Sequence, residues 1–293
     1  MALRASILAA TLLACVVPCS GVGTPPIRVA VYAGEGTMPV EPDLLPCLRA
    51  SDDLAAATVD GRSIRAGALA DYDVIVFPAG MSSAQSAALG PAGRQRVQEF
   101  VRDGGGYIGI CAGAYLALTG EHGPRTDRLE LLAAASIDPW RRGEGLVRMR
   151  PSDGTPGCQL DYQNGPVMKL VEREGVPPAT VLAHYGEATR GLLRSGIGGG
   201  IGVIAGDYGR GRVLLFGPHP ERRPGCGWVL RQGVRWSARR AERSGDETTW
   251  STAIPPLTLT IPSHRVPSAV RRAIQSIPAF LYLQRMADVV GAD

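Results

Sequence analysis

Residues 104–115 read GGGYIGICAGAY, an apolar run that stops at Cys111 and restarts among small residues. This pattern is typical of a buried strand that turns sharply into a helix. Gly109 and Gly113 permit a strained turn that holds the Cys111 side chain out of the sheet, and the first N–H groups of the new helix favour a thiolate there. The segment therefore predicts a cysteine nucleophile on a strand-to-helix elbow, weighed against the buried small side chain that most free cysteines become.

A second segment supplies the groups that a cysteine nucleophile requires. Residues 211–217 predict a buried strand, and His219 and Glu221 follow it directly. An imidazole two residues from a carboxylate is a base with its orienting group. Taken singly, His219 could bond a carbonyl at a strand end and Glu221 could be a surface carboxylate. Together with an elbow cysteine, they predict a triad of Cys111, His219 and Glu221.

These two segments resemble the class I glutamine amidotransferase-like superfamily and, within it, the family named after the N-terminal domain of biotin-protein ligase. The narrower resemblance adds four segments in matching order and spacing: 31–37 (VYAGEGT), 77–80 (FPAG), 161–165 (DYQNG) and 182–185 (LAHY). The resemblance covers residues 27–240. It implies a flavodoxin-like parallel sheet with helices on both faces, to which this chain adds a β-rich insertion and a C-terminal extension.

The alternation of apolar runs and helical segments predicts the same α/β architecture independently. Expected strands are 27–32, 55–59, 73–77 and 107–110, and expected helices are 43–50 and 91–102. Short β segments separated by turns from 129 to 185 predict an antiparallel insertion that walls one side of the pocket. Strands at 201–205 and 211–216 and a helix at 228–240 are expected to close the domain.

Both ends of the chain are expected to lie outside this α/β domain, which spans 24–241. Residues 1–23 combine Arg4, a short apolar stretch and small residues, which predicts a signal peptide cleaved near 21–23. Cys15 allows a lipoprotein signal as an alternative, and only lipidation there would attach the chain to a membrane. We therefore expect an exported protein, periplasmic or extracellular, with a C-terminal extension of unassigned role at 242–293.

The charge and cysteine content of the chain limit the kinds of molecule that it is expected to bind. The formal net charge is only +4, and Lys169 is the sole lysine among 31 basic residues. Because no dense basic stripe with interleaved aromatic residues occurs, nucleic-acid binding is not expected. No paired C-x-x-C spacing occurs, so a zinc-ribbon site is not expected. No metal site and no cofactor are predicted. The expected partner is a small-molecule substrate, and the oligomeric state is left open.

Four cysteines remain beyond the predicted signal peptide: Cys47, Cys111, Cys158 and Cys226. Export would permit a disulfide. If Cys111 stays free, Cys158 and Cys226 are the best candidates, because both lie in loops rich in glycine and proline. Three unpaired thiols are the equally weighted alternative.

Acyl transfer requires backbone N–H donors for the oxyanion. We expect one from Ala112, next to the nucleophile, and by resemblance a second from Gly80, where the lack of a side chain lets the backbone approach substrate. Tyr162, Asn164 and Tyr185 match recurrent family positions and could line the pocket. Tyr and Asn in turns more often serve packing and Asx hydrogen bonds, which is the competing interpretation.

Position 115 bears on the substrate. Glutamine amidotransferases of this superfamily usually carry Gln four residues after the nucleophile, where this chain has Tyr115. A phenol cannot reproduce the paired donor and acceptor of an amide. We therefore expect Tyr115 to line the substrate site and free glutamine to be a poor substrate.

The sequence thus predicts an exported thiol hydrolase or amidotransferase-like protein that acts on a small amide or acyl substrate. A non-catalytic binding module that retains the fold and pocket is the first alternative. A redox-sensing thiol at Cys111 is the second, because elbow cysteines of related proteins can form a reversible sulfenic acid.

Overall fold

The computed structural model describes residues 24–121, 125–139, 142–154, 157–193 and 196–239. The predicted signal peptide at 1–23, with Cys15 in it, lies outside the described residues. So does the predicted extension at 242–293. The structure therefore bears on the α/β domain alone.

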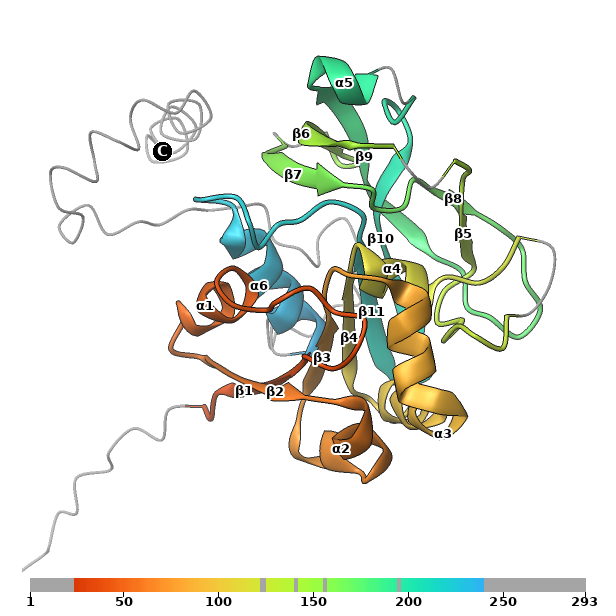
Figure 1. Ribbon diagram of the computed structural model, residues 1–293. Helices are drawn as coiled ribbons and strands as arrows, with labels where there is room; N and C mark the ends of the chain where they lie inside the picture. Colours follow the sequence, from red (N-terminus) through yellow and green to blue (C-terminus); the bar gives the residue numbers. More distant parts are fainter. Residues whose placement is uncertain (1–23, 122–124, 140–141, 155–156, 194–195, 240–293) are drawn as a thin grey trace, which may run out of the picture.

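Five strands form the parallel part of the sheet: β1 (Ile27–Tyr32), β2 (Leu54–Val59), β3 (Val74–Phe77), β4 (Gly106–Ile110) and β11 (Gly211–Phe216). They lie in the order β2-β1-β3-β4-β11 (Figure 1). This is the strand order of flavodoxin-like sheets, whose ligands bind at the carboxyl ends of the strands. β3 and β4 are buried at every position, as expected for strands covered on both faces. The predicted flavodoxin-like fold is confirmed.

Helices cover both faces of the parallel strands (Figure 1). Their bounds are α1 (Leu44–Arg49), α2 (Gly61–Arg65), α3 (Ser82–Arg102), α4 (Ala112–Ala117) and α6 (Gly227–Ser237), with a short 3₁₀ helix at Ala68–Asp71. α1 and α6 pack together on one face, where Leu48 and Trp236 share a core cluster. α2, α3 and α4 cover the other face, where Ile64, Leu89 and Leu116 share the second cluster.

The helix expected at 91–102 is only the second part of α3. Gly90 has φ 63° and ψ 176°, so it breaks the helical path, and Pro91 begins the next turn. The first part, Ser82–Leu89, was not predicted. Its sequence, SSAQSAAL, is small and polar and lacks the apolar periodicity by which a helix is recognised.

The β-rich insertion continues the same sheet with antiparallel strands. β10 (Ile201–Tyr208) pairs with β11, and β9 (Thr180–Ala188), β6 (Glu144–Pro151) and β7 (Gln159–Gln163) follow outward. β5 (Ala134–Ser136) and β8 (Met168–Leu170) pair beside this path, and α5 spans Arg190–Leu193. The sheet is therefore mixed, and the expected antiparallel wall is an extension of it.

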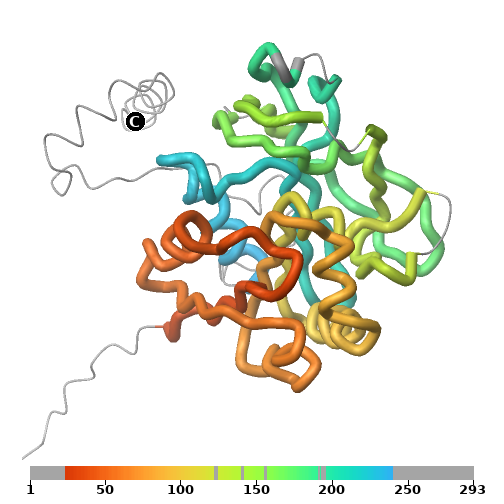
Figure 2. The backbone as a smooth tube through the Cα atoms, in the orientation of Figure 1, coloured from red at the N-terminus to blue at the C-terminus, as the bar shows by residue number. Residues whose placement is uncertain are grey.

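β7 lies at the end of the strand order, yet it returns to the parallel strands. Asp161 forms an isolated antiparallel bridge with His219, just beyond β11. Figure 2 shows the green insertion lying over the cyan loop that follows β11. The insertion thus covers the carboxyl end of the parallel sheet, where a site is expected.

Candidate active site

Cys111 occupies a strained turn between β4 and α4. Its φ is 52° and its ψ is −101°, a combination outside the regular regions that costs about 1–3 kcal/mol. The Cys111 N–H donates to the carbonyl of Phe216 at 2.8 Å, and its own carbonyl accepts the N–H of Tyr115 at 3.0 Å. The backbone is therefore held in the elbow that residues 104–115 predict.

Glycines make this elbow possible by close approach. A Cβ on Gly113 would collide with the carbonyl oxygen of Phe77 in the neighbouring strand. A Cβ on Gly109 would lie only 2.5 Å from the carbonyl oxygen of Gly113. The first turn of α4 can therefore lie against β3 and β4 only because both positions lack side chains.

His219 and Glu221 follow β11, the strand beside β4. Phe216 pairs with Ile110, so the two chains leave the sheet next to each other. The His219 side chain is fully buried, and its Nδ1 lies 2.9 Å from Oε1 of Glu221, whose side chain is only 5% exposed. The structure thus places Cys111, His219 and Glu221 together at the carboxyl ends of adjacent parallel strands.

The charge state of His219 reflects these neighbours. Burial lowers the pKa of His219, but contacts with the Cys111 side chain and with Glu221 outweigh it and raise the pKa to about 9. Nε2 makes no hydrogen bond of ordinary geometry to any described residue. At neutral pH the imidazolium is the favoured form.

A main-chain carbonyl of the insertion closes over the thiol. Cys111 Sγ donates to the carbonyl of Gln163 at 3.4 Å, and Cys111 is only 7% exposed. Two contacts hold this segment in place: the His219 N–H donates to the carbonyl of Asp161 at 2.8 Å, and Gly165 approaches Gly217 so closely that a Cβ would collide. Gln163 was not predicted as a site residue, because a main-chain contact leaves no mark on residue type.

Arg222 is a second site residue that the sequence analysis missed. Its Nη1 donates to Oε1 of Gln163 at 2.8 Å. Its Nε lies 3.9 Å from Glu221 Oε1 and 3.8 Å from Asp43 Oδ2. The guanidinium therefore joins β7 to the His219–Glu221 pair. Its position directly after Glu221 in the sequence was the only available signal.

The four predicted pocket side chains hydrogen-bond to the main chain of the insertion, and the Tyr185 hydroxyl does so by donating to the Pro166 carbonyl at 2.9 Å. The Tyr115 hydroxyl donates to the Asn164 carbonyl at 3.2 Å, and burial, with smaller effects from its neighbours, raises the pKa of Tyr115 to about 12. Asn164 has φ 50°, and its Oδ1 accepts the N–H groups of Arg142 and Gly143, each at 2.8 Å. The Tyr162 hydroxyl donates to the Gly165 carbonyl at 2.8 Å. All four build the site wall, and direct substrate contact stays a prediction.

The two expected oxyanion donors lie at the ends of adjacent strands. Ala112 is the first residue of α4, and Gly80 follows β3 with φ 145°. A Cβ on Gly80 would collide with the carbonyl of Gly36. The Met38 N–H donates to the Ala79 carbonyl and the Met81 N–H donates to the Gly36 carbonyl, and these two bonds join the loop at 36–38 to the loop at 79–81. The Gly80 N–H takes part in neither bond. Their part in binding an oxyanion stays a prediction.

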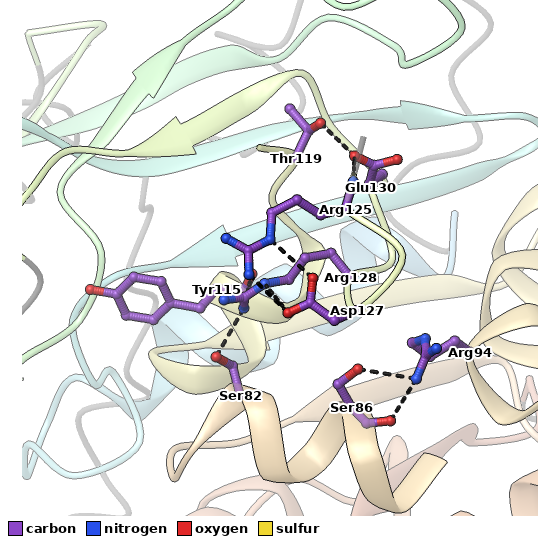
Figure 3. A network of polar contacts seen from close by, with 9 residues as sticks. All are labelled: Ser82, Ser86, Arg94, Tyr115, Thr119, Arg125, Asp127, Arg128 and Glu130. Atoms are coloured by element: carbon purple, nitrogen blue, oxygen red, sulfur yellow. Dashed lines mark hydrogen bonds and ion pairs between the residues drawn. The ribbon is translucent and has the colours of Figure 1, made fainter. Parts of the chain in front are cut away.

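Arg128 ties the elbow helix to the neighbouring helix α3 (Figure 3). Its Nη1 donates to the Tyr115 carbonyl at 2.7 Å and to Ser82 Oγ at 2.9 Å. Burial lowers the pKa of Arg128, whose side chain is 16% exposed. Figure 3 also shows the Tyr115 ring directed away from this network. Arg128 therefore supports the α4 backbone from the side opposite the Tyr115 hydroxyl.

Among the described residues, His, Cys, Asp and Glu side chains form no group of three or more that could hold a metal ion. No helix in the described part of the chain has the length and apolar character needed to cross a membrane.

Known proteins offer structural likenesses at low identity. A solved glutamine amidotransferase aligns with a TM-score of 0.49 and 21% identity, over 72% of this chain and 98% of that one. A cytoplasmic protein from Salmonella typhimurium aligns with a TM-score of 0.45 and 17% identity, over 73% and 98%. A GH42 beta-galactosidase aligns with a TM-score of 0.43 and 17% identity, over 70% of this chain and 28% of that one. No curated protein sequence matches the chain.

A family model gives the sequence match. Residues 27–121 match the family described as biotin-protein ligase, N terminal. The matched stretch includes β1 to α4 and the Cys111 elbow, whereas His219 and Glu221 lie beyond it. The resemblance expected from residues 31–37, 77–80 and 104–115 is thereby confirmed, and the part of this chain from β1 through the elbow helix is similar to the biotin-protein ligase N-terminal family.

Proposed function

We propose that this chain is an exported cysteine-dependent hydrolase or amidotransferase-like enzyme that acts on a small amide or related acyl substrate. The observation that carries the proposal is the strained backbone at Cys111 beside the buried His219–Glu221 pair. A cysteine that serves packing requires neither strain nor a charged neighbour, and backbone strain concentrates at functional sites. The geometry supports a nucleophile better than a packing residue.

In the proposed reaction the Cys111 sulfur attacks the substrate carbonyl carbon. His219 holds the thiol proton and donates it to the leaving amine, which leaves a thioester on Cys111. Glu221 accepts a hydrogen bond from Nδ1 and stabilises the imidazolium. The N–H groups of Ala112 and Gly80 stabilise the oxyanion, and water or another acceptor, deprotonated by His219, then cleaves the thioester.

The raised pKa of His219 supports this assignment. With a pKa of about 9, the imidazole is protonated at neutral pH. A thiolate beside an imidazolium is the reactive form of cysteine nucleophiles. Turnover of a mixture of small amides and esters, compared between the wild type and Cys111→Ala, tests the proposal. Equal turnover by the two proteins would exclude catalysis at Cys111.

A non-catalytic binding module is the second candidate function. The covering of Cys111 by the Gln163 carbonyl favours it, because a thiol that donates to a carbonyl and is 7% exposed is a poor nucleophile in that position. Catalysis would require residues 161–165 to move away from Cys111 when substrate binds. For a module of this kind, the wild type and the Cys111→Ala variant would bind the ligand equally tightly, and neither protein would turn it over.

Free glutamine is expected to be a poor substrate. Tyr115 stands where glutamine amidotransferases carry Gln, and its hydroxyl is bonded to the Asn164 carbonyl. Sites built to bond a polar substrate group lose much of their affinity when that partner is absent. Ammonia release from millimolar glutamine should be no faster with the wild type than with Cys111→Ala. A clear glutaminase rate that depends on Cys111 would move this protein among true amidotransferases.

Export is proposed from residues 1–23 alone. We expect protein recovered from its native host to lack this segment, with a new N-terminus near 21–23 when its intact mass is measured. A diacylated Cys15 would select the lipoprotein branch. An intact N-terminus on cytosolic protein would contradict export altogether.

A further inference from the structure

Cys158 and Cys226 meet beside the candidate site although they are far apart in the sequence. Cys158 immediately precedes β7, and Cys226 immediately precedes α6. Cys226 Sγ lies 3.6 Å from the carbonyl oxygen of Gln159, the residue next to Cys158, so the two thiols lie close enough to shift each other's pKa. Both side chains are half-buried against the same core cluster. In the structure the four described cysteines are free thiols.

We propose that Cys158 and Cys226 form a disulfide when the protein meets a disulfide-containing oxidant, and that the bond fastens β7 to the segment after β11. The proposal that this bond forms rests on the proximity of the two thiols. Its importance for Cys111 rests on the proposed function, because β7 ends at the Gln163 carbonyl above Cys111 and the other segment carries His219 and Glu221.

The bond would form by thiol–disulfide exchange with the oxidant. The interaction between the thiols lowers the pKa of Cys226 and raises that of Cys158, so Cys226 is the first to react. Its thiolate attacks the disulfide of the oxidant and releases one thiol, which forms a mixed disulfide. Cys158 then loses its proton, attacks the Cys226 sulfur and releases the second thiol. Two electrons and two protons pass to the oxidant.

The other two thiols have different neighbours. Cys47 Sγ lies 3.6 Å from the Gly227 carbonyl and 3.9 Å from Nη1 of Arg231. Cys111 Sγ donates to the Gln163 carbonyl. Cys47 lies beside the N-terminus of α6, as Cys226 does, but its partners are a carbonyl and a guanidinium. This makes Cys47→Ser a matched control for Cys226→Ser.

The bond would restrict the part of the chain that assembles the site. The Cys158 carbonyl accepts the N–H of Met149 at 2.8 Å, which fixes this end of β7 to β6. Farther along β7, the Asp161 carbonyl accepts the His219 N–H at 2.8 Å. A link from Cys158 to Cys226 would therefore hold the His219 segment at a second point, on the far side of Glu221.

Peptide mapping and thermal unfolding test the proposal. Full-length protein is reduced, dialysed, treated with oxidised glutathione, alkylated in denaturant and digested with trypsin without reduction. Arginine and lysine residues separate Cys47, Cys111, Cys158 and Cys226 from one another, so each of these four falls in its own peptide. We expect a linked Cys158–Cys226 peptide and a Tm about 5–10 °C above that of the reduced protein. Cys158→Ser and Cys226→Ser should each abolish the gain, and Cys47→Ser should retain it.

Several results would overturn the proposal. Alkylation of both thiols after oxidation would do so, as would a link from either one to Cys47, Cys111 or glutathione alone. A correct link with an unchanged Tm would refute the claim that the bond fastens the two segments. A protein without activity on any amide would still form the bond, so this experiment and the turnover assay fail independently.

Discussion

Replacing His219 with Ala is expected to slow the alkylation of Cys111 by iodoacetamide at pH 7 by about 10-fold or more and to reduce turnover by about 10³-fold or more. The removed imidazolium is the buried cation next to the thiol, and its pKa of about 9 keeps it charged at that pH. Without the imidazolium, Cys111 loses the neighbouring positive charge, and acyl transfer loses the general acid that protonates the leaving amine. Rates at Cys111 are measured by peptide mass spectrometry after timed labelling.

Matched variants separate chemistry from folding. His184→Ala removes a half-buried histidine from β9 and should leave both rates unchanged. Cys111→Ser is nearly isosteric, so it should fold normally and show neither labelling at 111 nor turnover. Glu221→Gln should have a milder effect than His219→Ala, because it weakens the orienting bond without removing the base. Full activity of Cys111→Ser, or unchanged labelling in both His219→Ala and Glu221→Gln, would end the triad hypothesis.

The free energy of unfolding is expected to fall by about 3 kcal/mol between pH 6.5 and 9.5 through His219 alone. The pKa of His219 is about 9 in the folded protein, against an ordinary value of about 6.5 in the unfolded chain. A raised pKa means that the folded state binds the proton more tightly. This stabilisation is therefore complete below about pH 6.5 and is lost as the pH rises through about 9.

Urea unfolding of the wild type and His219→Asn at several pH values isolates this contribution. Other groups titrate in the same range, so the informative quantity is the difference between the two proteins. That difference should shrink as the pH rises from 6.5 to 9.5. Parallel curves would show that His219 carries no raised pKa, and a difference that grows with pH would show a lowered one.

Local sequence determined much of the fold and the three central residues of the site. The apolar run at 107–110, the cysteine after it and the glycines at 109 and 113 admit few conformations other than a strand, a strained turn and a helix, because only small residues tolerate the approach to Phe77. Local sequence likewise predicted the strand at 211–216 and the position of His219 and Glu221 directly after it. The alternation of strands and helices then predicts a parallel sheet, whereas the strand order became known only from the structure.

Tertiary structure alone decided what covers Cys111. Nothing in residue type showed that β7 returns to place the Gln163 carbonyl 3.4 Å from Cys111 Sγ, or that Arg222 joins Gln163 to Glu221. The sequence left open whether Cys158 and Cys226 pair or stay unpaired, and their proximity became known only from the structure. Local patterns predict backbone conformation over a few residues, whereas these contacts depend on how an antiparallel insertion curls over the sheet, which is fixed by packing between segments far apart in the chain.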